Sequence, residues 1–211
     1  MAAGSSPTGP ALTPKGERTR SRIVAVAADL MFENGVAGTT IEDVRIAAGV
    51  SNSQIYHYFS DKAELIRAVI DHQTDAVLEP QQPIFSRLDT WEGLQDWRDY
   101  AVNHQKELNC RGGCPIASLS GQLAEADDAA RLQLALSFRR WSAGLRSGLL
   151  AMAERGALSA DADPEQLAVV LLTSLQGGLL LTQLERDVAP LETALDAALE
   201  HVRIRMTTVP A

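Results

Sequence analysis

The sequence contains 211 residues, of which 45% are hydrophobic, and its formal net charge at pH 7 is −8. This length suffices for a sizeable core in one or two domains, and the apolar fraction excludes a globally disordered chain. Aromatic residues make up 5% of the chain, and the Val, Ile and Thr alternation typical of strands is nearly absent. We therefore predict an all-α protein.

We find no sequence signal for export or for membrane insertion. The N-terminal run MAAGSSPTGPALTPK lacks the basic segment and apolar core of a signal peptide. The most apolar stretch, Leu167 to Leu184, is interrupted by polar residues, which argues against a transmembrane helix. Two cysteines cannot form a disulfide framework. We therefore expect a cytoplasmic protein that has no membrane partner.

The negative charge is unevenly distributed along the chain. Residues 1–72 contain seven Lys or Arg and eight Asp or Glu, whereas residues 73–211 contain twelve and nineteen. These counts give net charges of −1 and −7. Near the N-terminus, basic residues outnumber acidic ones in residues 15–22. The charged residues of this segment are Lys15, Glu17, Arg18, Arg20 and Arg22. This distribution permits a modest, steered contact between the first segment and phosphates.

The chain is predicted to begin with a tail and one amphipathic helix. Residues 1–13 are rich in Gly, Ser, Pro and Ala, and we expect them to be disordered. A helix follows from about Lys15 to Asn34, and Gly35 is suited to end it in the left-handed conformation. Its apolar stripe consists of Ile23, Val26, Ala27, Leu30 and Met31. The basic residues before this stripe either contact a DNA backbone or form a solvated face.

The stretch TTIEDVRIAAGVSNSQIYHYFSDK, residues 39–62, predicts two short helices joined by a tight turn. Either Thr39 or Thr40 can cap the first helix with its hydroxyl, and carboxylates follow in the first turn. The glycine of the A-G-V-S turn supplies a positive φ. Ser51 can cap the second helix, with Gln54 as the reciprocal partner in a capping box.

The second of these helices has two chemically different faces. Ile55 and Phe59 face inward at i,i+4 spacing. The outward face carries amides, hydroxyls and aromatic rings, namely Asn52, Ser53, Gln54, Tyr56, His57 and Tyr58. Amides can bond bidentately to adenine, and tyrosine hydroxyls reach phosphate oxygens. We predict a helix-turn-helix whose second helix enters the DNA major groove; the alternative is a hairpin that serves only for packing.

A fourth helix is predicted to connect this region to the rest of the chain. It begins at Asp61, a suitable N-cap, and runs to about Leu78, where the sequence EPQQP interrupts it. Lys62 then lies beside a helix N-terminus, which is a favourable place for a phosphate. We expect a DNA-binding domain at 14–62, a connecting helix and linker at 63–82, and a second domain at 83–211.

The second domain is predicted to consist of long amphipathic helices. The first, between Thr90 and Asn109, has a stripe formed by Trp91, Leu94, Trp97, Ala101, His104 and Leu108. A turn at CRGGCP leads to a helix from Pro115, and a long helix runs from about Asp128 to Arg155. The next helix, capped by Asp163, is apolar on nearly all sides, so a partner subunit is the simplest cover for one of them. A final helix runs from Pro190 to about Met206.

Residues 30–65, LMFENGVAGTTIEDVRIAAGVSNSQIYHYFSDKAEL, resemble the TetR family of transcriptional regulators. The matching features are L-x-F-x-x-x-G, T-T-I-x-D-V, A-G-V-S and I-Y-H-Y-F-x-x-K-x-x-L, at consistent offsets. The resemblance implies that Tyr56, Tyr58 and Lys62 hold phosphates. It implies that the residues near base edges are Ser51, Asn52, Ser53, Gln54 and His57, and Thr40 belongs to the same DNA-binding set. The chain departs from many members in having no Lys or Arg between Ser51 and Asp61.

The resemblance also implies a homodimer, with the last two helices at a twofold axis and a palindromic operator as the DNA partner. It further implies a small-molecule effector that binds among the helices of the second domain and releases a repressor from DNA. The candidate effector residues are Trp97, Tyr100, His104, Cys114, Phe138, Trp141, Met152 and Gln176. Their composition favours a largely apolar or aromatic effector, and the alternative is that most of them are plain core.

Cys110 and Cys114 provide an alternative function, because they flank a flexible R-G-G segment that would allow a disulfide. Arg111 and the helix N-terminus at Pro115 would favour a thiolate, so a repressor that senses oxidants or electrophiles is chemically possible. We predict no metal site, because His104 and the two cysteines lack a fourth ligand. We predict no cofactor and no enzymatic activity, because the histidines are scattered and no catalytic motif is present.

Overall fold

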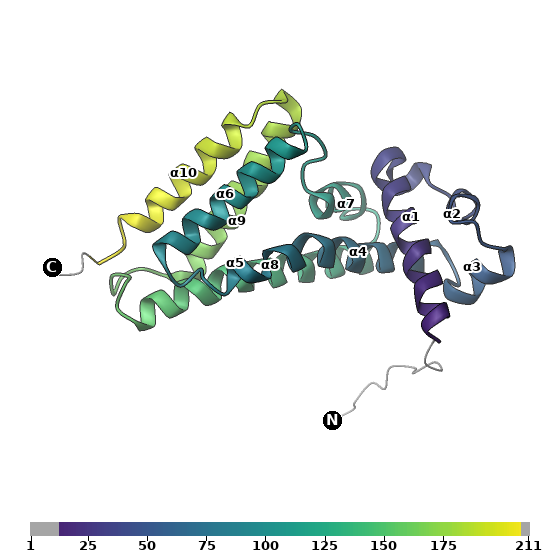
Figure 1. The fold of residues 1–211 in the computed structure, drawn as a ribbon, viewed down its shortest axis with the longest axis horizontal. Coiled ribbons are helices and arrows are strands. Elements are labelled where there is room, and N and C mark those ends of the chain that lie inside the picture. The colour runs from purple at the N-terminus through teal and green to yellow at the C-terminus, as the bar shows by residue number, and fades with distance from the viewer. Residues whose placement is uncertain (1–12, 208–211) are drawn as a thin grey trace. The chain divides into compact units, whose positions relative to one another are not determined.

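The structure, a computed structural model, describes residues 13–207, and within these residues it is built from α-helices (Figure 1). The described part contains no strand, and its one β-bridge joins Leu158 to Met206. This confirms the predicted all-α fold. The chain forms two compact units, Met1–His72 and Gln73–Ala211, and the helix α4, Lys62–Leu78, crosses the boundary between them.

The described part of the first unit contains three helices before α4, namely α1 (Pro14–Gly38), α2 (Ile41–Ala47) and α3 (Asn52–Tyr58). Most of the predicted tail, residues 1–12, lies outside the described residues, while Thr13 caps α1 by accepting from the backbone N–H of Gly16 at 3.2 Å. Gly35 has non-helical angles, φ 77° and ψ 159°, so the regular part of α1 ends where the sequence predicted. The core of this unit includes Ile23, Ala27, Met31, Val44, Ile55 and Phe59.

The second unit contains the remaining elements, which are η1 (Glu79–Gln81), α5 (Gln82–Phe85), α6 (Trp91–Glu107), α7 (Pro115–Leu123), α8 (Asp128–Glu154), α9 (Pro164–Glu185) and α10 (Ala189–Arg203). The predicted interruption at EPQQP is a 3-10 turn followed by one short helix. Gln81 in this turn is buried and accepts a hydrogen bond from the indole N–H of Trp97 at 3.1 Å. Gln81 therefore connects this otherwise exposed turn to the core.

The predicted stripe on α6 is wrong at its C-terminal end. Leu94 and Trp97 are buried as expected, but His104 is exposed and Leu108 is 40% exposed. Gln105, which is only 2% exposed, takes the inward position instead. His104 and Gln105 lie three and four positions after Ala101, and either spacing fits the same helix face. A pattern of apolar residues could not show that the glutamine is the one that is buried.

Helices α9 and α10 lie side by side and make the most extensive contact between two helices of this unit (Figure 1). Gly178 of α9 faces α10, and a Cβ added there would stand 2.9 Å from the Cα of Leu191. The apolar face of α10, including Leu195 and Leu199, is buried within its own chain. A helix of the same chain therefore makes this close approach, because only a residue without a side chain leaves room for the backbone of α10.

The opposite side of α9 is exposed and apolar. Its large apolar side chains are between 47% and 69% exposed and consist of Val169, Leu180, Leu181 and Leu184. By length and composition α9 could cross a membrane, but 44% of its most apolar window is buried inside the chain, as in the core helix of a globular protein. One side of α9 thus belongs to the core, and the other is exposed and apolar.

We predict that Gly178→Ala destabilises the protein by about 1–3 kcal/mol, because the added methyl group overpacks the contact with Leu191. The matched control is Gly177→Ala, where an added Cβ would meet nothing within 4 Å of the same chain. The control should be neutral or stabilising by up to about 1 kcal/mol, since alanine favours a helix. Urea unfolding of both variants measures the difference, and equal effects would contradict the packing of α9 on α10.

Candidate nucleic-acid interface and effector residues

Two capping boxes fix the beginnings of α2 and α3. Thr40 Oγ1 accepts from the backbone N–H of Asp43 at 3.1 Å, and Asp43 Oδ2 accepts from the backbone N–H of Thr40 at 2.8 Å. Ser51 and Gln54 form the same reciprocal pair at 3.2 and 2.9 Å, as predicted. Thr39 is buried instead, and its hydroxyl donates to backbone carbonyls of α1. Each helix start is thus determined by residues three positions apart.

The capping box also lowers the pKa of an acidic side chain at this surface. Hydrogen bonds from the Thr40 hydroxyl, and then from its backbone N–H, hold the pKa of Asp43 below its usual value. Asp43 is therefore ionised at neutral pH, and the contribution of this cap to stability is lost only as the pH falls through that lowered pKa.

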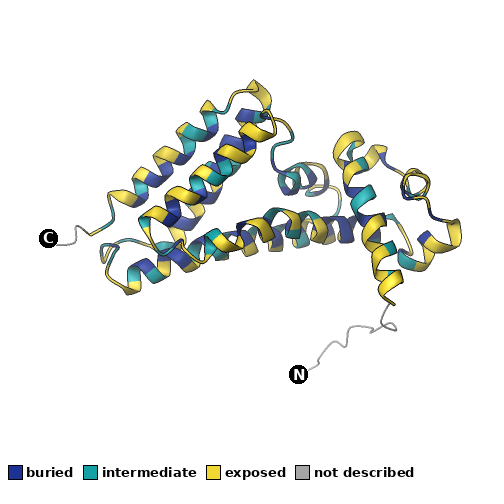
Figure 2. Cartoon of the chain, in the orientation of Figure 1, coloured by how far each residue is buried: buried dark blue, intermediate teal, exposed yellow. Residues whose placement is uncertain are grey.

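Helix α3 presents a polar face over a buried anchor. Ile55 and Phe59 are at most 1% exposed, and the ribbon of α3 is mostly exposed in Figure 2. Of the residues predicted to face outward, Tyr58 is half-buried. The others are exposed, namely Asn52, Ser53, Gln54, Tyr56 and His57. The structure therefore gathers the predicted base-reading residues on one accessible helix face.

Some of these side chains already have partners that limit what they can offer DNA. The carbonyl oxygen of Gln54 is used in the capping box, so its amide N–H groups are the part left to read an acceptor on a base edge. Ser51 Oγ lies 3.0 Å from Ser53 Oγ. The side chain of Asn52 forms no hydrogen bond within residues 13–207, so both ends of its amide are available.

The predicted phosphate contacts have different surroundings. Tyr56 is 54% exposed. The ring of Tyr58 instead meets that of His57 edge-on, with the two ring centroids 5.0 Å apart. Lys62 Nζ donates to the carbonyl of Val36 at 2.7 Å. An ammonium has three N–H donors, so this bond fixes the direction of the side chain and leaves two donors for a phosphate.

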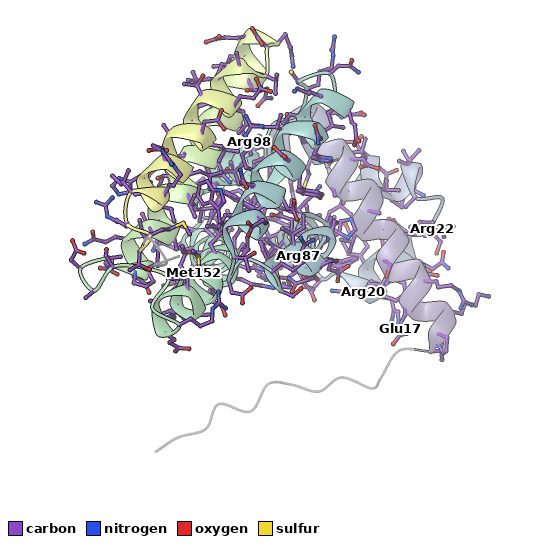
Figure 3. The ribbon with its side chains drawn as sticks, turned by 60° about the vertical axis from the view of Figure 1, so that its left-hand side comes forward. Glu17, Arg20, Arg22, Arg87, Arg98 and Met152 are labelled. Carbon is purple, nitrogen blue, oxygen red and sulfur yellow. The ribbon has the colours of Figure 1, made fainter. Side chains whose placement is uncertain are left out.

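Two arginine contacts in the first unit were not predicted from the sequence. The guanidinium of Arg20 lies over the ring of Phe59, 5.2 Å from its centroid, and Figure 3 shows Arg20 and Arg22 on α1. Arg45 of α2 binds Glu42 through both guanidinium Nε and Nη2, at 2.7 and 2.5 Å. The second contact has a signal in the sequence, because the two residues are three positions apart on one helix.

The predicted effector residues lie on three helices of the second unit, α6, α8 and α9, except for Cys114, which is the N-cap residue of α7. Trp97, Cys114, Trp141 and Met152 are buried, and His104 is the one that is exposed. The rings of Phe138 and Trp141 are parallel with centroids 6.5 Å apart, and those of Tyr100 and His104 are parallel at 6.0 Å. Four of these residues thus form two ring pairs, one within α6 and one within α8.

Several buried polar atoms in this unit have no hydrogen-bond partner among the described residues. They include the indole N–H of Trp141 and the side-chain carbonyl oxygens of Gln105 and Gln176. Trp141 is 3% exposed and Gln105 is 2% exposed. Buried polar groups are normally satisfied, so these atoms could bind neutral groups of a small molecule that offers both a donor and acceptors.

Both cysteines are reduced and buried, with exposed fractions of 8% for Cys110 and 7% for Cys114. Burial raises the pKa of the Cys114 thiol, although hydrogen bonds from the backbone of Ala117 and Ile116 and from the side chain of Gln176 lower it. The predicted activation of this thiol by the helix N-terminus is therefore outweighed by its desolvation.

Two family models match this chain. Residues 23–69 match a model described as bacterial regulatory proteins, tetR family, and residues 90–198 match the tetracyclin repressor-like C-terminal domain. The second match alone covers more than half of the chain. The chain belongs to the TetR family of transcriptional regulators. The match at residues 23–69 contains α2 and α3. The DNA-binding domain of this TetR-type regulator therefore lies in the first unit.

Known proteins agree with this assignment. An HTH-type transcriptional regulator from Mycobacterium tuberculosis (strain ATCC 25618 / H37Rv) is 29% identical over 82% of this chain and 88% of its own length. The repressor DhaR from Mycobacterium sp. (strain GP1) is 25% identical over 86% and 90%. A TetR regulator from Chloroflexus aurantiacus J-10-FL has the same fold, with a TM-score of 0.79 over 93% of this chain and all of that one, at 23% identity. The two curated relatives therefore point to a transcriptional regulator.

We predict that both thiols of this TetR protein react slowly with an aromatic disulfide reagent in the native state and rapidly in urea, because burial blocks access to both. At Cys114, burial also disfavours the thiolate. The absorbance of the released thiolate measures both rates. Raising the pH above about 9 should accelerate the native reaction of Cys114, since its pKa lies above the usual value. A fast native reaction at pH 7 would contradict the inert setting of this cysteine.

Proposed function

We propose that this protein is a homodimeric, ligand-responsive repressor that acts in the cytoplasm, binds a palindromic operator and is released by a small effector. The observation that carries the proposal is the exposed polar face of α3, held by the Ser51–Gln54 capping box above buried Ile55 and Phe59. A short surface helix with this pattern is suited to read base edges. The repressor activity named for DhaR supports the direction of regulation.

We assign DNA binding to residues 14–62. Asn52 and Gln54 would read base edges, and Ser51, Ser53 and His57 would lie beside them. Tyr56, Tyr58 and Lys62 would hold phosphates, with Thr40 at the start of α2 nearby. The absence of basic residues from α3 means that most of the affinity for phosphates has to come from Lys62 and the basic residues of α1.

The exposed face of α9 supports the proposed dimer. Four large apolar side chains on one helix, including Leu180 and Leu184, would be covered if α9 of a second copy packed against them. Two recognition helices related by a twofold axis would then meet successive major grooves about 34 Å apart. Binding by both would raise the affinity above that of either one alone.

We assign effector binding to the region 83–211, with residues 63–82 as the connection to the DNA-binding domain. Trp97, Phe138, Trp141 and Met152 favour a largely apolar molecule. The unpartnered polar atoms of Trp141 and Gln176 favour one that also carries a neutral hydrogen-bonding group. The buried thiols favour this effector-binding function over the alternative of a repressor that senses oxidants through Cys110 and Cys114.

We predict that Tyr56→Phe weakens binding to every duplex by about 3- to 10-fold, because it removes one hydroxyl that reaches a phosphate. Asn52→Ala should instead change the base preference at one position of each half-site. Selection of bound duplexes from a random pool yields the operator of the parent and of each variant. The same duplex then reports release by candidate effectors, in particular neutral aromatic amides compared with aromatic hydrocarbons and carboxylates.

Lys62→Met tests a phosphate contact made by a charged group. Because it removes one positive charge, it should reduce the slope of log affinity against log salt by about one. Binding of the parent to no duplex at low salt would refute the proposed DNA binding. An unchanged base preference after Asn52→Ala would instead refute the placement of Asn52 on base edges.

We predict that Leu180→Glu makes the protein monomeric at micromolar concentration, because it places charge in the apolar face of α9. The control is Leu132→Glu, which alters an equally exposed leucine, at 52%, on α8. Sedimentation velocity of both variants measures the oligomeric state. A dimer that survives Leu180→Glu but dissociates with the control would assign the interface to α8.

A further inference from the structure

Arg45 binds both ends of the segment that carries the turn of the helix-turn-helix. Its guanidinium Nε and Nη2 donate to the two carboxylate oxygens of Glu42, in the first turn of α2, at 2.7 and 2.5 Å. Its Nη1 donates to the carbonyl of Val50, beyond the end of α2, at 3.3 Å. The backbone carbonyl of Arg45 also accepts from the N–H of Val50 at 3.2 Å. One residue thus contacts Val50 through its backbone and its side chain.

Val50 is the residue through which this contact would act on α3. It is 5% exposed, and it directly precedes Ser51, the N-cap of α3. Helix α3 has only seven residues, and its inward anchors are Ile55 and Phe59. A short helix has little stability of its own, so its direction depends on how its first turn and its buried side chains are held.

We propose that Arg45 is a positioning residue for DNA recognition, which fixes the turn between α2 and α3 through Glu42 and Val50 and makes no contact with phosphate itself. This inference rests on the proposed DNA binding. The fork of donors matches the carboxylate of Glu42 in both spacing and charge, and this leaves Nη1 directed at the carbonyl of Val50. Arg45 is thereby committed within the protein, although its side chain is 27% exposed.

The competing role is that Arg45 swings outward and binds a phosphate. The two roles make opposite predictions for Glu42. If Arg45 binds phosphate, neutralising Glu42 frees the arginine and removes a negative charge near DNA, so affinity rises. If Arg45 positions the turn, neutralising Glu42 removes the fork that orients its guanidinium, so affinity falls although a negative charge is lost.

The experiment measures the affinity of the full-length protein for its selected duplex over a range of salt concentrations. Glu42→Gln, Arg45→Ala and the double variant are compared with the parent. We expect each single change to weaken binding about two- to fivefold per recognition helix, the range given by an exposed ion pair. The double variant should be no weaker than either single one, because both break the same contact. The slope of log affinity against log salt should not change.

Arg45→Lys tests whether charge alone is sufficient. Lysine keeps the charge but cannot bind Glu42 with a fork and Val50 at the same time, so we expect it to restore less than half of the lost affinity on a logarithmic scale. The control pair is Arg131 with Asp128 on α8, at the same i,i+3 spacing. Arg131→Ala should leave DNA binding unchanged. Thermal unfolding of each variant establishes that the compared proteins are folded at the temperature of the assay.

Three results would overturn the inference. They are tighter binding by Glu42→Gln, a loss of about one unit of salt slope in Arg45→Ala, or affinities of both variants equal to the parent. These outcomes are separate from a failure of the proposed function, in which the parent itself would bind no duplex.

Discussion

The DNA-binding unit depends on the burial of Ile55 and Phe59 beneath a helix of only seven residues. Burying two side chains of this size stabilises the unit by roughly 1.5–3 kcal/mol each, which is more than a free helix of this length could supply by itself. This anchor forces the opposite face of α3 outward, and that face carries amides and aromatic rings. The capping boxes and Arg45 then determine where the helix begins and how it is held.

The second unit is governed by the two sides of α9. Gly178 allows α10 to approach so closely that the two helices form one hairpin. The apolar face of α10 is thereby buried within the chain. The leucines on the far side of α9 are left without a cover among the described residues. One side of this helix therefore stabilises the unit, and the other carries the apolar surface that we propose as the dimer interface.

The sequence predicted most of the fold and failed where polar residues are buried. The all-α class, the Ser51–Gln54 box and the end of α1 at Gly35 were predicted correctly, because each depends on residues within one turn of each other. On α6 the prediction placed His104 inward, whereas Gln105 is buried. The stacking of Arg20 on Phe59 was also missed, because it joins residues 39 positions apart in the sequence. The positions of the predicted DNA and effector contacts remain predictions.

The sequence by itself determined the long helices, the Ser51–Gln54 capping box and the resemblance to the TetR family, since helix geometry brings residues three and four positions apart into contact whatever the rest of the chain does. Only the tertiary structure decided that Gly178 meets α10 of the same chain, that Lys62 is held by the carbonyl of Val36, and that Cys114 is buried. These contacts join segments that are distant in sequence, and their existence depends on how whole helices pack. No local pattern of residue types can specify them.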